Sequence, residues 1–100
     1  MYVGTLSFDL LLGDVASLKQ KRSVVRPIVA ELRRKYPVSA AEVGEQDLHR
    51  RAVIGLAVVS GDAAHVTDVL DRCERWMTGR PEVELLSARR RVHGGDDWDD

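Results

Sequence analysis

Apolar and polar residues alternate through the first strand-like segment, residues 2–12. The apolar set, with one glycine, falls on every second position, and Thr5, Ser7 and Asp9 lie between its members. A period of two is typical of a strand with one buried face. The residues expected on that face are Tyr2, Gly4, Leu6, Phe8, Leu10 and Leu12. We predict a half-buried strand that ends at the turn signal Gly13-Asp14.

After Ser17 the apolar spacing changes to three and four residues, which predicts a helix that runs to about Lys35. Its apolar stripe comprises Val25, Ile28, Val29, Leu32 and Tyr36. Ser17 and Gln20 have the spacing of a capping box and are expected to cap this helix. Pro27 conflicts with a regular helix because it removes one hydrogen bond, at a cost of about 3 kcal/mol. Two interpretations remain open: a kink at Pro27, which we favour, or a separate short turn over 18–22.

The rest of the chain predicts two more strands, a second helix and a final strand. The expected ranges are a strand at 38–43, a polar loop at 44–49, a central strand at 51–60 and a last strand at 83–92. The second helix follows Gly61-Asp62, and its stripe is Val66, Val69, Leu70, Cys73, Trp76 and Met77. The run Arg89-Arg90-Arg91 is expected on an exposed edge strand, where its charge opposes pairing with other chains.

The predicted element order is βαββαβ within residues 1–93. The economical arrangement is an α+β, ferredoxin-like sandwich, with a four-stranded antiparallel sheet and both helices on one face. In that arrangement the first two strands are parallel and the third lies between them. Residues 94–100 are expected to form an acidic, disordered tail, in which Trp98 has no assigned role.

The net charge of −1 conceals an uneven distribution. The chain has 15 basic and 16 acidic residues, and four of the acids are in the tail. Residues 1–93 therefore carry 15 bases and 12 acids, a net charge of +3. Cys73 is the only cysteine, which excludes an internal disulfide and suits a reducing, cytoplasmic compartment. The longest apolar stretch, around Val53 to Val59, is too short to span a membrane, and no signal segment is expected.

The predicted topology brings several charged residues to one edge of the sheet, beside the start of the first helix. The expected structural ion pairs at this edge involve Lys21, Glu42, Asp47 and Arg51. Either Glu42 or Asp47 pairs with Lys21 or Arg22, or the bases form a phosphate site at the helix N-terminus. At 100° per residue, Lys21 falls beside the apolar stripe. The residues expected to face solvent as an anion-binding or RNA-binding strip are Lys19, Arg22, Arg26 and Arg33.

Other kinds of site are not indicated. His49 and His65 are expected at opposite edges of the sheet, so the sequence predicts no metal site. No serine has a predicted neighbouring histidine and acid, and no glycine-rich phosphate loop is present. We therefore expect no catalytic residue and no cofactor, and the sequence leans away from an enzyme. The open sheet face offers no aromatic side chain for stacking on RNA bases, which leaves phosphate contacts or protein contacts.

Several short motifs resemble those of the YlxP-like family of small bacterial proteins, over residues 1 to about 92. The matching residues are Ser17-Leu18-Lys19-x-Lys21-Arg22-Ser23, Ala41-Glu42-Val43, Gln46-Asp47, Arg51-Ala52-Val53 and Val59-Ser60. The resemblance implies a ferredoxin-like fold with no established activity. It also implies a link to ribosome assembly or translation, because family genes often neighbour genes for those processes. Pro27 and the acidic tail depart from the family pattern.

The leading hypothesis is a cytoplasmic, non-enzymatic accessory factor in ribosome maturation or translation. Its expected partners are ribosomal RNA or ribosomal proteins. Two alternatives remain open: a protein-interaction module that acts as a homodimer, and a small-molecule anion-binding protein. Neither a membrane nor a metal is expected as a partner.

Overall fold

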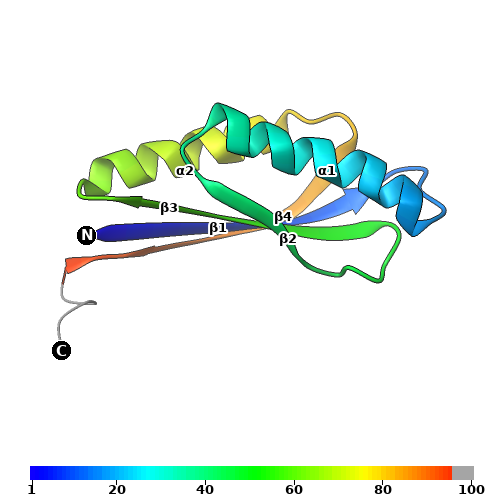
Figure 1. Ribbon diagram of the computed structural model, residues 1–100, viewed down its shortest axis with the longest axis horizontal. Coiled ribbons are helices and arrows are strands. Elements are labelled where there is room, and N and C mark those ends of the chain that lie inside the picture. The colour runs from blue at the N-terminus through cyan, green and yellow to red at the C-terminus, as the bar shows by residue number, and fades with distance from the viewer. Residues whose placement is uncertain (96–100) are drawn as a thin grey trace.

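The computed structural model describes residues 1–95 and has two layers, with both helices on one side of a single sheet (Figure 1). The elements are β1 (Tyr2–Leu12), α1 (Leu18–Lys35), β2 (Ser39–Gly44), β3 (Arg51–Ser60), α2 (Ala63–Thr78) and β4 (Val83–His93). The predicted order βαββαβ is therefore confirmed. Of the expected tail, residues 96–100, including Trp98, lie outside the described residues.

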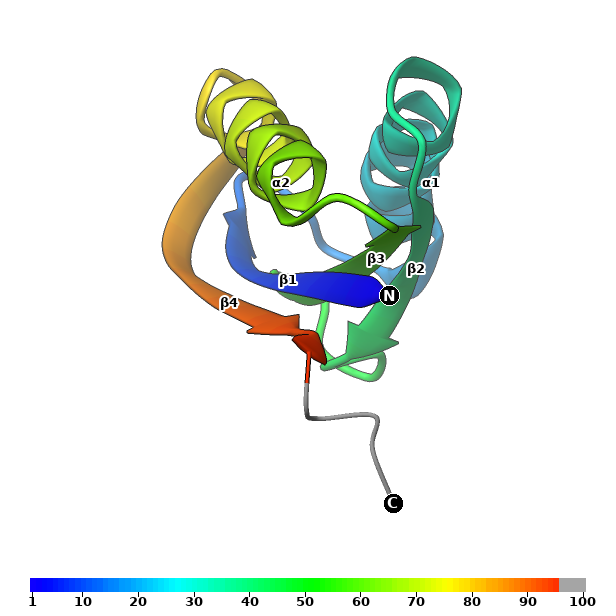
Figure 2. The same cartoon turned by 90° about the vertical axis from the view of Figure 1, so that its left-hand side faces the viewer.

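The sheet order is β2-β3-β1-β4, and all three pairings are antiparallel. This is the ferredoxin-like arrangement predicted from the sequence, with β3 between the parallel strands β1 and β2. The end view shows α1 above the β2 side of the sheet and α2 above the β4 side (Figure 2). β2 and β4 are the two edge strands. Neither helix in residues 1–95 is long and apolar enough to cross a bilayer.

β1 is the central strand, and its alternation places one face against the helices. Leu6, Phe8, Leu10 and Leu12 are buried almost completely. At Gly4 the sheet and α2 approach closely, because a Cβ atom there would lie 2.5 Å from Val66 Cγ1. Glycine at this position therefore allows α2 to pack directly on the strand.

α1 is one continuous helix through Pro27, so the alternative of a separate turn over 18–22 is wrong. Pro27 and Ser23 are both exposed, and water can therefore solvate the Ser23 carbonyl that lacks a backbone donor. At the N-terminus, Ser17 Oγ accepts a hydrogen bond from the Gln20 backbone N–H at 3.1 Å. Gln20 Oε1 accepts from the Ala16 N–H at 2.6 Å, one residue before the position that a capping box would use.

α2 packs its apolar stripe against the sheet. Val66, Val69, Leu70, Cys73 and Met77 are buried. Trp76, which the stripe places in the core, is only partly buried. The Arg80 guanidinium covers its ring at 4.6 Å from the centroid, so this tryptophan forms the rim of the core.

The pairing of β1 with β4 contains a β-bulge. Asp9 is opposite Ser87, whereas Leu10 is opposite Leu85, so Leu86 is the additional residue. A bulge reverses the alternation of side chains along the strand. Up to Leu85 the odd-numbered residues of β4 therefore face the helices, and from Ser87 onward the even-numbered ones do.

Candidate functional site

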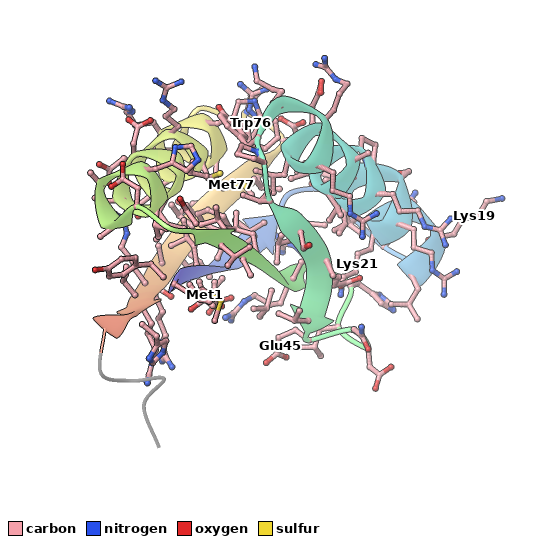
Figure 3. All side chains as sticks on the ribbon, turned by 60° about the vertical axis from the view of Figure 1, so that its left-hand side comes forward. Met1, Lys19, Lys21, Glu45, Trp76 and Met77 are labelled. Atoms are coloured by element: carbon pink, nitrogen blue, oxygen red, sulfur yellow. The ribbon has the colours of Figure 1, made fainter. Side chains whose placement is uncertain are left out.

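The Lys21 side chain lies between α1 and the loop that joins β2 to β3 (Figure 3). The residue is only 2% exposed, and it is the one buried charged residue among residues 1–95. Its Nζ donates hydrogen bonds to the backbone carbonyls of Glu45 at 2.6 Å and Leu48 at 2.8 Å. The Glu42 carboxylate lies 3.0 Å away. Two of the ammonium protons are thus donated to carbonyls, the carboxylate lies within ion-pair distance, and burial keeps the group from an external anion.

The contact between Glu42 and Lys21 is an ion pair and not a directed hydrogen bond. Its Oε2 atom is buried and accepts no hydrogen bond within residues 1–95, although Lys21 Nζ is within ion-pair distance. The loop turns at Glu45, whose φ of 57° lies in the left-handed region that non-glycine residues rarely adopt. We infer that Lys21 holds this turn, because the Glu45 carbonyl is one of its acceptors.

The other two residues expected in this ion-pair group lie elsewhere. Arg51 forms a two-pronged pair with Asp9 on the open face of the sheet, with its Nη2 2.6 Å from Asp9 Oδ2 and 2.7 Å from Oδ1. These hydrogen bonds hold the pKa of Arg51 above its ordinary value. Asp47 is exposed in the loop and has no ion pair within the described chain. The edge pair is therefore formed by Lys21 and Glu42 alone.

The sequence reasoning did not identify Asp9 as a partner of Arg51. The missing information is the strand register: Leu11 is opposite Arg51 and Asp9 is opposite Val53, so Asp9 is a diagonal neighbour of Arg51 on the same face. Register between strands far apart in the sequence is fixed by the whole sheet, and alternation within one strand does not determine it.

The four bases expected on α1 all belong to its exposed residues. Lys19, Arg22 and Arg26 form no ion pair within residues 1–95, and Lys19 extends away from the protein (Figure 3). We call these three residues the basic strip. Arg33 differs, because its Nε donates to the Ala40 carbonyl of β2 at 2.9 Å. It therefore binds the edge strand in addition to presenting charge.

The open face of the sheet carries small and polar side chains. Strand register places Val3, Thr5, Ser7, Asp9 and Leu11 on it, and none of the aromatic residues in residues 1–95 lies there. A shallow hollow of about 270 Å³ lies on this face. Its lining is Ser7, Asp9, Glu45, Val53, Ser87 and Arg89. The face has no platform for stacked bases.

The described residues contain no group of three or more histidine, cysteine or acidic side chains that could hold a metal ion. His49 lies in the β2–β3 loop and His65 lies in the first turn of α2, at opposite ends of the sheet. Cys73 is buried in the core, and burial raises the pKa of its thiol to about 11. It is therefore protonated at neutral pH and has little nucleophilic character.

Comparison with known proteins gives two matches. The sequence pattern of a family described as "Protein of unknown function (DUF503)" matches residues 3–90. The chain is also 32% identical to the "Uncharacterized protein YlxP" of Bacillus subtilis (strain 168) over 87 residues, which cover 87% of this chain and 95% of that protein. The resemblance to the YlxP-like family is thereby confirmed.

Proposed function

Because the chain belongs to the DUF503 family of proteins of unknown function, we propose its function from its own surface. The proposal is a cytoplasmic, non-enzymatic accessory factor in ribosome maturation or translation. It contacts structured RNA, or RNA within a ribonucleoprotein, through the basic strip on α1. The observation that carries the proposal is the row of unpaired cations Lys19, Arg22 and Arg26.

These residues project from one side of the helix. At 100° per residue, their directions fall within about 60° of each other, and the Arg33 direction falls within the same arc. From Lys19 to Arg33 the helix rises about 21 Å at 1.5 Å per residue. A row of cations of this length can contact several phosphates of one nucleic-acid strand at once.

The position of the strip also favours an anionic partner. The N-terminus of α1 has partial positive charge, and its first turn contains no acidic residue. Lys21 is neutralised internally, but no acid within residues 1–95 pairs with Lys19, Arg22 or Arg26. The bases and the positive end of the helix therefore repel one another, and a bound phosphate would reduce this repulsion.

Phosphate contact suits this chain better than base recognition. Single-stranded RNA readers stack bases on aromatic side chains of an open sheet, and this open face has none among the described strands. The resemblance to the YlxP-like family implies a link to ribosome assembly or translation, so ribosomal RNA is the RNA that we propose. The small-molecule anion alternative is not favoured, because Lys21 is buried, donates to two carbonyls of the chain and lies beside the Glu42 carboxylate.

The test measures binding to ribosomal RNA over a range of salt concentrations for the wild type and Arg22→Ala/Arg26→Ala. Each phosphate contact contributes roughly 0.7–0.9 to the slope of log affinity against log salt concentration. The double variant should therefore bind more weakly at low salt, and its slope should fall by about 1.4–1.8. Equal affinities and slopes would contradict the proposal.

A matched control removes two arginines from the other helix. Arg72→Ala/Arg75→Ala changes the net charge by the same amount on exposed residues of α2. It should leave the affinity and the slope close to those of the wild type. If both double variants lose affinity equally, binding depends on overall charge, and the α1 interface is wrong.

A further inference from the structure

The two edges of the sheet differ in how their backbone is protected. On β2, the Ala40 carbonyl accepts from Arg33 Nε at 2.9 Å, and the Glu42 carbonyl lies 3.5 Å from Gln46 Nε2. These side chains occupy groups that another strand would need. On β4, no side chain within residues 1–95 bonds to the backbone between Val83 and Val92, and the strand is exposed from Leu86 onward. β4 is therefore the edge that is open to a further strand.

β4 has acidic residues at its start and basic residues near its end. Glu84 is the second residue of β4 and Glu82 directly precedes the strand, whereas Arg89 and Arg91 are near its end. None of these four forms an ion pair within residues 1–95. Arg90 is different, because it faces α2 and pairs with Asp71 at 2.7 Å and Glu74 at 3.4 Å.

The bulge places these unpaired charges on the same face. Glu84 is opposite Leu11, and Arg89 is opposite Ser7, and both of those partners belong to the open face. In a regular strand, side chains five residues apart would face opposite ways. The extra residue Leu86 reverses the alternation, so Glu84 and Arg89 both face away from the helices. Their partners on β1 are four residues apart, so the two charges are about 13 Å apart along the strand, too far to pair within one chain.

We propose that β4 pairs antiparallel with β4 of a second copy of this chain, which joins two sheets into one of eight strands. Antiparallel pairing places the acidic start of one strand against the basic end of the other. With the twofold axis between Leu86 and Ser87, Glu84 faces Arg89 of the second copy and Glu82 faces Arg91. The same pairing brings together the two copies of Leu86, which is 43% exposed in the single chain.

The charges on β4 thus favour an antiparallel copy of the same strand over other strands. An unrelated strand, or a parallel copy, would meet an uncompensated cluster of bases. An antiparallel copy supplies an acid for each of Arg89 and Arg91. The proposed dimer is independent of RNA binding, since the basic strip belongs to α1, which lies on the β2 side of the sheet, opposite the β4 edge (Figure 2).

The experiment uses charge reversal and mixing. Sedimentation of the wild type over micromolar to millimolar concentrations should show a weak dimer that dissociates as salt is added. Glu84→Arg and Arg89→Glu should each raise the dissociation constant about tenfold, because two symmetric pairs become repulsive. An equimolar mixture of these two variants should form a heterodimer about as tight as the wild-type dimer. In the mixed dimer, every Arg at positions 84 and 89 faces a Glu. In a dimer of either variant alone, residues of like charge face each other at these positions.

The mixture also separates the proposal from a folding defect, because only folded variants can restore association. The control Lys35→Glu reverses an exposed charge far from β4 and should leave the dimer unchanged. A monomeric wild type would overturn the proposal. A dimer that neither β4 reversal weakens would also overturn it. A mixture that associates no better than its components would have the same consequence.

Discussion

Lys21 Nζ lies 3.0 Å from Glu42 Oε2, and this contact links the first turn of α1 to the end of β2. The two residues are 21 positions apart in the sequence. The lysine side chain is 3% exposed and the glutamate side chain 25%. A charged residue so deeply buried is stable only while its partners remain, because removing one partner leaves the other charge uncompensated.

The Lys21→Met variant should therefore be strongly destabilised. It removes the charge beside Glu42 and both bonds to loop carbonyls, and breaking a buried pair from one side costs about 3–5 kcal/mol. Adding Glu42→Gln should recover part of the loss, because the uncompensated carboxylate is then gone. The free energy of unfolding from urea titration measures both effects. A Lys21→Met protein as stable as the wild type would show that this contact has little importance.

The Asp9–Arg51 pair should respond much more weakly, although its geometry is two-pronged. Its side chains are 30% and 38% exposed, so water screens the charges. Asp9→Asn should change the free energy of unfolding by less than about 1 kcal/mol. The same urea titration compares it with Lys21→Met, and similar losses for the two variants would contradict the assigned difference in burial.

Replacing Pro27 should stabilise the protein. In Pro27→Ala, a backbone N–H returns that can donate to the Ser23 carbonyl, and alanine has the highest helix propensity. We expect a gain of about 1–3 kcal/mol in thermal or urea unfolding. Ser23→Ala is the control, since it changes an exposed residue of the same helix without adding a backbone donor. A gain equal to that of the control would contradict this explanation.

Gly4 should not accept even a methyl group. Gly4→Ala would place Cβ 2.5 Å from Val66 Cγ1 and 2.9 Å from Leu70 Cδ1, so α2 must shift. Overpacking of this kind costs about 1–3 kcal/mol. Gly13→Ala provides a matched control, because nothing lies within 4 Å of its Cβ position. Unfolding experiments should show a loss for the first variant and almost none for the second.

Stability should fall at alkaline pH because of Cys73. Burial raises the pKa of its thiol from 9.0 to about 11, so the unfolded chain loses this proton before the folded one does. The stabilisation is complete below pH 9 and is lost as the pH rises to about 11, by about 2–3 kcal/mol. Urea titrations over this range should show that Cys73→Ala lacks this part of the decline. An identical pH dependence for the variant would contradict the assignment.

The sequence was sufficient for the fold because its periodicity is strong in each element. The alternation in residues 2–12 and the stripes of both helices predict which side chains are buried, and these side chains fix the layers. The position of Lys21 beside the apolar stripe of α1 likewise indicated a residue turned toward the sheet. The sequence was less informative where partners come from distant segments. The pairing of Asp9 with Arg51, the bond from Arg33 to Ala40 and the bulge at Leu86 all depend on register between strands.

Lys21 binds the β2–β3 loop through two backbone carbonyls and makes no hydrogen bond or ion pair to the side chains of residues 45–48. Any amino acid presents the same carbonyl, so the anchor does not constrain which side chains the loop displays. Gln46, Asp47 and Leu48 are all exposed and can vary without loss of the anchor. A new recognition sequence can therefore be inserted at residues 46–48, while Lys21 is kept to hold the loop backbone in place.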